Sequence, residues 1–256
     1  MIGTKRIIFS RGGLFLLAAV AIFLLGFAAA DDSSSSSSVH FQLLNCRTLD
    51  FKPKLGVELK GGTKRRAYPQ LTVTFTARGQ GDTNLKEIEV SMPHSELLAQ
   101  EHIREICTRA QFKVDKCPAG SVYGSAVAYT PLFDQPLRGN VYLRSSPHQL
   151  PDLVASLYSG AIHIVLEGEV GGTKQGGIRA LFRELPDEPL EKFVMTLNGG
   201  KRGLLQNSSN ICVEPPLASV KALGQNNLGT EFSSVLRGQC KKKHSKRHQI
   251  HRRGDR

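Results

Sequence analysis

The sequence predicts a mainly β protein, with one or two antiparallel β-sandwich-like domains and a short helical insertion. Apolar and polar side chains alternate with a period of two along most of residues 41–240. The clearest example is residues 71–77, where Leu71, Val73 and Phe75 share one face and threonines occupy the other. Turn-forming Gly, Pro and Asn residues interrupt the alternation about every 10–20 residues, which favours antiparallel sandwiches over a parallel α/β sheet.

The remaining predicted strands share this alternation and are bounded by Gly-rich or Pro-containing turns. They cover residues 57–59, 88–90, 122–129, 141–143, 162–166, 178–182, 193–197 and 220–223.

One segment departs from the period of two. Between residues 95 and 110, Leu98, Ile103 and Ile106 recur near helical spacing, and Pro93 and Ser95 are typical of a helix start. We therefore expect one or two short helices there.

Two arrangements of the body fit the pattern. A boundary near residues 135–139 would give a β-rich domain over 41–137 and a β-sandwich-like domain over 138–240, and the alternative is one continuous sandwich. The Gly-Gly-Thr-Lys sequence at residues 61–64 recurs at 171–174, which either records a duplication or reflects the frequency of Gly-rich hairpin loops.

The positive charge lies at the two ends of the chain. Of the formal net charge of +12, residues 1–30 carry +3 and residues 241–256 carry +7, which leaves +2 for residues 31–240. A domain that binds nucleic acid has its basic residues on a folded face, so the sequence predicts no specific nucleic-acid partner.

Residues 1–30 have the pattern of an export signal. Lys5, Arg6 and Arg11 precede an apolar run that ends in Ala28-Ala29-Ala30, and small residues at these spacings are typical of a cleavage site. Cleavage after Ala30 is the favoured interpretation, and an uncleaved membrane anchor is the alternative. Residues 31–40, which contain six consecutive serines, are expected to form a flexible linker.

Export predicts that the cysteines pair. Two local pairs, Cys107 with Cys117 and Cys212 with Cys240, are preferred among the connectivities, which the sequence alone does not fix. Cys46 is then left over, either as a buried free thiol or in a bond to another chain or to a surface component.

Several segments of the body carry a resemblance to a known family. They are residues 46–55 (CRTLDFKPKL), 102–112 (HIREICTRAQF) with Cys117-Pro118, 141–146 (VYLRSS), 150–154 (LPDLV), Pro186-Asp187 and 199–208 (GGKRGLLQNS) followed by Cys212. Through these segments the body, over residues 41–240, resembles a family of uncharacterised secreted proteins of actinobacteria. The resemblance implies an exported, disulfide-bonded β protein, often with a Lys/His-rich tail, and it implies no activity.

Motifs of catalysis and metal binding are missing from the sequence. It contains no Gly-x-Ser-x-Gly nucleophile turn, no His-Glu-x-x-His metal motif and no phosphate-binding glycine loop. Neighbouring acids, such as Glu167 and Glu169, are interpreted as a solvated surface rather than a glycosidase pair. The sequence therefore favours a non-enzymatic protein without cofactor or metal, and the absence of Trp weighs against a sugar-binding module.

Residues 241–256 form a predicted disordered basic tail. Outside the membrane it would meet anionic envelope polymers or lipid head groups through long-range, salt-screened attraction. A purely solubilising role is the alternative. A third hypothesis is binding of Zn or Ni by His244, His248 and His251, which the neighbouring cations oppose. The cations expected to contact an anionic surface are Lys241, Lys242, Lys243, Lys246, Arg247, Arg252 and Arg253.

These observations predict an exported, non-enzymatic protein associated with the cell envelope, structural or adhesive in role. The alternative is an extracellular glycan- or peptide-binding module whose site is a loop cluster such as residues 199–210. A hydrolase without a recognisable motif is the least favoured hypothesis. The sequence does not indicate the ligand or the oligomeric state.

Overall fold

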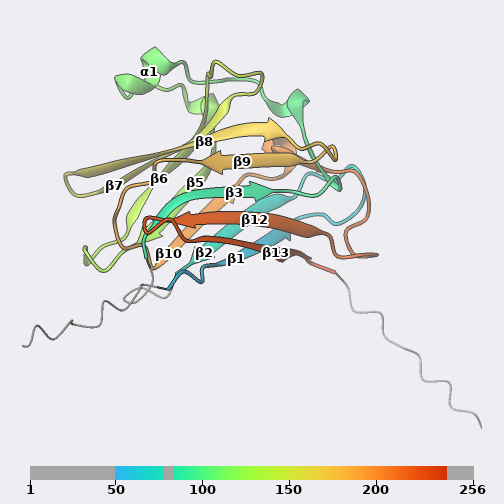
Figure 1. The fold of residues 1–256 in the computed structure, drawn as a ribbon. Helices are drawn as coiled ribbons and strands as arrows, with labels where there is room; N and C mark the ends of the chain where they lie inside the picture. The colour runs from blue at the N-terminus through green and yellow to red at the C-terminus, as the bar shows by residue number, and fades with distance from the viewer. Residues whose placement is uncertain (1–49, 78–82, 241–256) are drawn as a thin grey trace, which may run out of the picture. The chain divides into compact units, whose positions relative to one another are not determined.

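A computed structural model describes residues 50–77 and 83–240, and these residues form a closed β-barrel of 11 strands (Figure 1). The mainly β prediction is confirmed. The predicted sandwich is wrong, because β1 (Lys54–Lys60) pairs with both β2 (Gln70–Thr76) and β13 (Gly229–Gly238), which closes the sheet on itself. That β1–β13 pair is parallel, whereas the other neighbours in the barrel are antiparallel.

The other strands follow in a fixed order around the barrel from β13 back to β2. They are β12 (Leu217–Gly224), β3 (Leu85–Ser91), β9 (Ile178–Phe182), β8 (Ile162–Gly172), β7 (Asp152–Ser159), β6 (Leu137–Arg144), β5 (Val122–Tyr129) and β10 (Lys192–Leu197).

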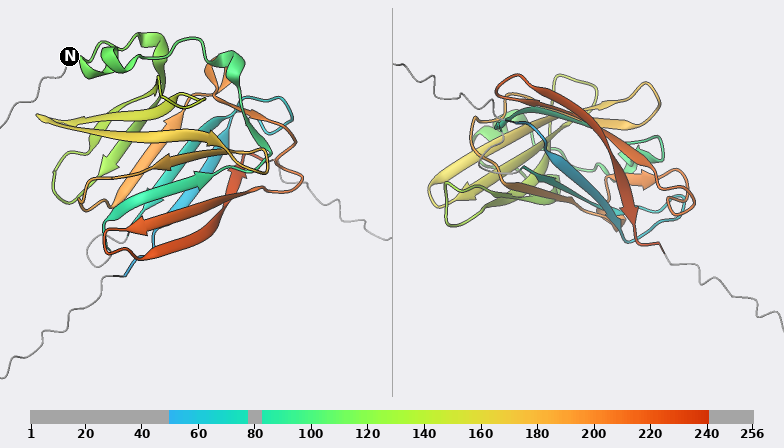
Figure 2. Two further views of the ribbon diagram at one scale, coloured as in Figure 1. Left: turned by 45° about the horizontal axis from the view of Figure 1, so that its top comes forward. Right: turned by 60° about the horizontal axis from the view of Figure 1, so that its bottom comes forward.

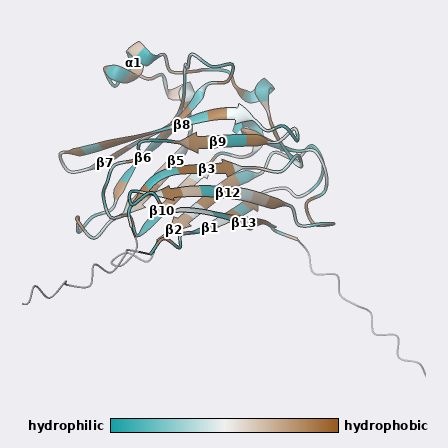
Figure 3. Cartoon of the chain, in the orientation of Figure 1, coloured by the Kyte–Doolittle hydropathy of each residue, from teal (hydrophilic) through white to brown (hydrophobic). Residues whose placement is uncertain are grey.

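The barrel has two groups of strands that face each other. Figure 2 shows strands β8, β9, β3 and β12 crossing in front of β5, β10, β2 and β1 at an angle. A sandwich and a barrel both bury one face of each strand, so both produce a period of two in the sequence. The alternation therefore predicted the strands correctly but could not distinguish a sandwich from a closed barrel. Figure 3 shows the resulting change between hydrophilic and hydrophobic residues along the strands.

Strands from both sides of the expected boundary share this one sheet. The boundary near residues 135–139 falls at the start of β6, which forms a hairpin with β5. Strand β3 lies between β12 and β9, and β10 lies between β2 and β5.

Each predicted strand lies within or overlaps a strand of the barrel, but two long strands were missed. In β7, residues 152–157 are buried on both faces, so the segment lacks alternation. Strand β13 is rich in Gly, Ser and charged residues and is exposed along much of its length.

The helix predicted within residues 95–110 is wrong over most of that segment. Residues Glu96–Leu98 form a short strand, β4, paired with β11 (Leu205–Asn207), and Gln100–His102 form the 3-10 helix η1. The α-helix, α1, spans Arg109–Lys113 and begins after Thr108, whose side chain accepts from the Gln111 backbone while Gln111 accepts from Thr108 in return. Two further 3-10 helices are η2 (Ala119–Ser121) and η3 (Gly200–Arg202).

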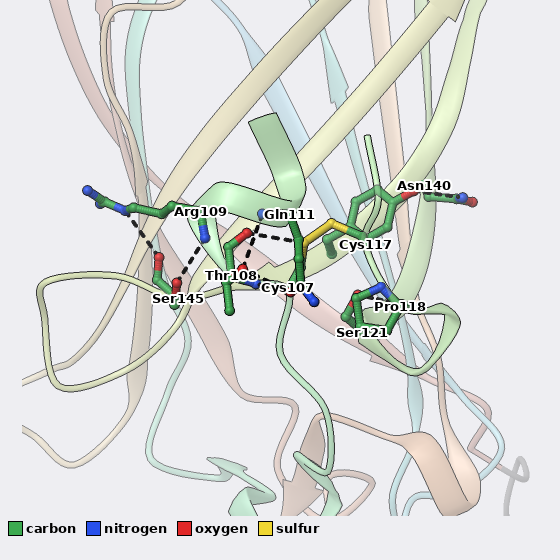
Figure 4. Close-up of a disulfide and its surroundings, with 10 residues drawn as sticks. Cys107, Thr108, Arg109, Gln111, Cys117, Pro118, Ser121, Asn140 and Ser145 are labelled. Atoms are coloured by element: carbon green, nitrogen blue, oxygen red, sulfur yellow. Dashed lines mark hydrogen bonds between the residues drawn. A yellow bond between two sulfur atoms is a disulfide. The ribbon is translucent and has the colours of Figure 1, made fainter. Parts of the chain in front are cut away.

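Both predicted disulfides, Cys107–Cys117 and Cys212–Cys240, are confirmed. The first disulfide encloses α1 (Figure 4). It fastens α1 beside β6, because Cys107 forms an isolated β-bridge with Arg144. In this bridge the Cys107 backbone N–H donates to the Leu143 oxygen, and the Cys107 oxygen accepts from the Ser145 N–H. Ser145 also accepts from the Arg109 backbone and side chain.

The strand registers give the barrel two distinct ends. We call one the disulfide end, because it carries both disulfides; its connections are residues 61–69, 92–121, 145–151, 173–177 and 198–216. We call the other the hairpin end; its fully described connections are residues 130–136, 160–161, 183–191 and 225–228.

Candidate functional site

The inward face of the barrel is apolar but incompletely filled. Along β8, Ile162, Ile164, Leu166 and Val170 point to the interior, whereas the alternate residues, such as Glu167, point outward. These inward side chains remain partly accessible although they face the centre of the barrel. The wall therefore surrounds space that its own side chains do not occupy.

This space is a cavity of about 410 Å³ that runs between the two ends of the barrel. Among the described residues that line it, only Thr130 and Glu188 have polar side chains. A barrel of more than about eight strands has an interior wider than its side chains readily fill. The volume lies in the range of about 300–1,000 Å³ that is typical of small-molecule sites.

The cavity reaches solvent at the hairpin end. Leu132, in the β5–β6 connection, is 51% exposed, and Ile162, at the start of β8, is 39% exposed, yet both line the cavity. Pro186 and Glu188, from the β9–β10 connection, also line it and are exposed. We call these four residues the mouth.

The disulfide end is closed by the short ribbon of β4 and β11. Leu98 and Leu205 face each other across the ribbon, and both line the cavity together with Leu204. The backbone of Ala99 donates to Leu204, which extends the pairing beyond the two strands.

The loop at residues 199–210, which the sequence suggested as a glycan or peptide site, belongs to this closed end. It contains η3 and β11, and its Leu204 and Leu205 are buried against the cavity. Arg202 fixes the loop by donating to the backbone oxygens of Gly120 and Val122.

A buried carboxyl group lies in the same ribbon. Glu96 is 0% exposed and stands opposite Asn207, and neither of its carboxyl oxygens has a hydrogen-bond partner among the described residues. Burial raises the pKa of Glu96 to about 7. Glu96 is therefore largely neutral below pH 7.

Charged residues form a network on the outside of the barrel. Arg144, itself buried, contacts both carboxylate oxygens of Glu167 at 2.5 and 2.6 Å and reaches Asp152 at 3.2 Å. These hydrogen bonds lower the pKa of Glu167. Glu169, whose pKa is also lowered, pairs with Arg183 and Arg179.

The network changes the interpretation of Glu167 and Glu169, which the sequence suggested were merely solvated. Each is held ionised by arginine, whereas a general acid requires a raised pKa. Their arrangement fits a structural role that ties β6, β7, β8 and β9 together.

A serine and a histidine also meet on the outer face. Ser156 Oγ lies 2.8 Å from His163 Nε2, and the His163 ring stacks on Tyr158 with 4.1 Å between the ring centroids. Ser156 is 4% exposed, and in the described part of the chain no carboxylate is bonded to His163. A nucleophilic pair needs an accessible hydroxyl and a group that orients the base, so we interpret the contact as cross-strand packing.

Several residues singled out in the sequence lie outside the described ranges. They include Cys46, the proposed signal at 1–30, the linker at 31–40 and the basic tail at 241–256. Within residues 50–77 and 83–240, no cluster of three metal-ligating side chains occurs, and no helix is long and apolar enough to cross a membrane.

Comparisons with protein-family models, with curated proteins and with solved structures find no match for this chain. The function is therefore argued from the geometry of the barrel.

Sequence reasoning missed the cavity because a period of two indicates which side chains face inward and does not indicate whether they fill the interior. The signal that could have revealed it is the small size of two residues that line the cavity, Ala128 on β5 and Ala180 on β9. Small residues on facing walls leave interior space that larger ones would fill.

Proposed function

We propose that this chain is an exported, non-enzymatic protein that holds an apolar ligand inside its barrel. In this proposal the basic tail, residues 241–256, keeps the protein at anionic polymers or head groups of the cell envelope. The observation that carries the proposal is the cavity of about 410 Å³ with an almost wholly apolar lining.

The size and lining of the cavity support binding. An apolar cavity of about 150 Å³ stays dry and accepts a molecule such as benzene, and this cavity is more than twice as large. Water gains little there, since it needs two to four polar partners and the interior lacks them.

The energetic cost of the cavity also supports a ligand. An apolar cavity costs free energy because its lining lacks the van der Waals contacts that a filled core makes. A ligand that fills the space would recover much of this free energy.

The export part of the proposal is supported by the disulfides and by two features of the sequence. Two disulfides indicate an oxidising environment. The sequence adds the signal-like residues 1–30 and the resemblance to secreted actinobacterial proteins, which we retain as a hypothesis.

Ligand binding can be tested by titrating the protein with 1-aminoanthracene, an apolar fluorophore that brightens on leaving water. We expect saturable binding with one site. Ala180→Phe, which places a ring in the cavity, should weaken binding at least tenfold, whereas Ala110→Phe on the exposed surface of α1 should leave it unchanged. Far-UV circular dichroism would confirm that both variants are folded. Non-saturable binding, or equal binding by both variants, would overturn the proposal.

The tail can be tested separately. Deletion of residues 241–256, or about 0.5 M salt, should release the protein from isolated envelopes, because the attraction is electrostatic. Retention after both treatments would reject this part and leave the cavity unaffected.

A further inference from the structure

Resting on the proposed function, we infer that the ligand is a single-chain amphiphile with a cationic or neutral head group, whose head lies at the mouth beside Glu188. The inference comes from the distribution of polarity and charge along the cavity.

The polar side chains of the cavity lie at one end only. Thr130 belongs to the β5–β6 connection and Glu188 to the β9–β10 connection, both at the hairpin end. Towards the disulfide end, the cavity finishes against Leu98, Leu204 and Leu205. A polar group buried without a hydrogen bond is costly, so a head group is accommodated only at the mouth.

The cavity is also elongated. On β10 alone its lining runs from Phe193 to Leu197, about 13 Å at a rise of about 3.3 Å per residue, and further residues line it beyond both ends of this strand. This shape accommodates a linear hydrocarbon chain lying along the barrel.

The charges around the mouth disfavour an anionic head group. The two connections that line it, residues 130–136 and 183–191, contain Arg183 and five acidic residues, which gives a net charge of −4. The five are Asp134, Glu184, Asp187, Glu188 and Glu191.

Nearby cations offset this charge only in part. Arg138 and Lys192, at the adjoining ends of β6 and β10, would reduce it to −2, and Lys86 and Glu87 at the start of β3 together add no net charge. Arg183 is engaged by Glu169 and Glu87, and Lys192 lies over the Tyr129 ring.

Glu188 is the acid placed to contact a head group. Asp187, its neighbour, already accepts a hydrogen bond from Asn84. The Glu188 carboxylate makes no ion pair among the described residues, and it lines the cavity. It therefore remains available to an ammonium or hydroxyl group.

The test compares three ligands with the same chain: dodecylamine, dodecanol and dodecanoate. Each would displace 1-aminoanthracene at neutral pH and low salt, below its critical micelle concentration. We expect dodecylamine to bind most tightly and dodecanoate most weakly, with at least about a fivefold difference between them, as expected for a unit charge near one carboxylate at the surface.

Variants of Glu188 show whether this residue sets the preference. Glu188→Gln should reduce the ratio of the amine and carboxylate affinities, and Glu188→Lys should reverse their order. Glu214→Lys makes the same charge change on an exposed residue at the disulfide end and should leave the order intact.

The outcomes separate the two proposals. If 1-aminoanthracene binds saturably but the three ligands displace it equally, or Glu188→Lys changes nothing, the inference is overturned and the binding function stands. If 1-aminoanthracene does not bind, both fail.

Discussion

The ring of Phe182 lies directly over Gly168, in the place where a side chain on β8 would otherwise project. The two residues are opposite each other in the β8–β9 register, and a Cβ built on Gly168 would approach Phe182 Cζ to 2.5 Å. Phe182 also lines the cavity. The glycine therefore determines where this part of the cavity wall lies.

Gly168→Ala should lower the free energy of unfolding by about 1–3 kcal/mol, because the ring must move to admit the methyl group. Urea unfolding of the ligand-free protein would measure the change. Gly56→Ala is the matched control, since Gly56 is exposed within β1 and a Cβ there meets only one backbone oxygen at 3.9 Å. Equal effects in the two variants would show that the Phe182 contact is unimportant.

Glu96→Gln should change how stability depends on pH. In the folded protein the pKa of Glu96 rises from its ordinary value of 4.5 to about 7, so between these values the folded state binds more protons than the unfolded state. The contribution of Glu96 to the free energy of unfolding thus falls as pH rises from about 4.5 to 7. The fall amounts to roughly 3 kcal/mol in total, and the contribution is constant above pH 7.

The variant carries no titrating group at this position. It should therefore be more stable than the wild type at pH 8, and the difference should disappear near pH 4. Urea unfolding across this range measures it, with Glu214→Gln as an exposed control. If the stability of Glu96→Gln and of the wild type depended on pH in the same way, the pKa of Glu96 would not be raised in the folded protein.

Arg144→Ala should destabilise the barrel by about 3–5 kcal/mol, because it leaves the buried Asp152 carboxylate without its close cation. Arg109, at 3.8 Å and exposed, is a weaker partner. The double variant Arg144→Ala with Asp152→Ala should lose less than the sum of the two single variants. Arg237→Ala, on an exposed position of β13, should cost less than about 0.5 kcal/mol. Additive losses at Arg144 and Asp152 would reject the coupling.

Replacement of Cys107 and Cys117 together by serine should cost about 3 kcal/mol, because the bond closes a short loop in the unfolded chain. The corresponding change at Cys212 and Cys240, which closes a longer loop of sequence separation 28, should cost somewhat more, about 3.5 kcal/mol. Thermal unfolding with and without reductant would measure both. A reductant effect that persists in the variant lacking all four cysteines would show that the account of these bonds is wrong.

The sequence predicted local features well where one face of the chain is buried and the other is solvated. Strand β2 alternates residue by residue and was located from that pattern, and both disulfides followed from short separations. Strand β7 was not predicted, because burial on both faces removes the alternation. The helix start was misplaced because the capping pair of Thr108 and Gln111 was overlooked in favour of Ser95.

The candidate site could not be predicted in the same way. Closure of the barrel depends on β1 meeting β13, strands separated by nearly the whole described chain, and no local pattern encodes that pairing. The mouth likewise combines Leu132, Ile162 and Glu188 from three separate connections or strand ends, whose proximity only the fold creates.

The most direct test of the internal binding site is methyl NMR of the protein during titration with dodecylamine. The account predicts that the methyl signals of Ile164 and Leu166, which face the cavity, shift and saturate together, while those of Val235 on the exposed face of β13 stay in place. Shifts confined to exposed methyl groups, with Ile164 and Leu166 unchanged, would contradict it.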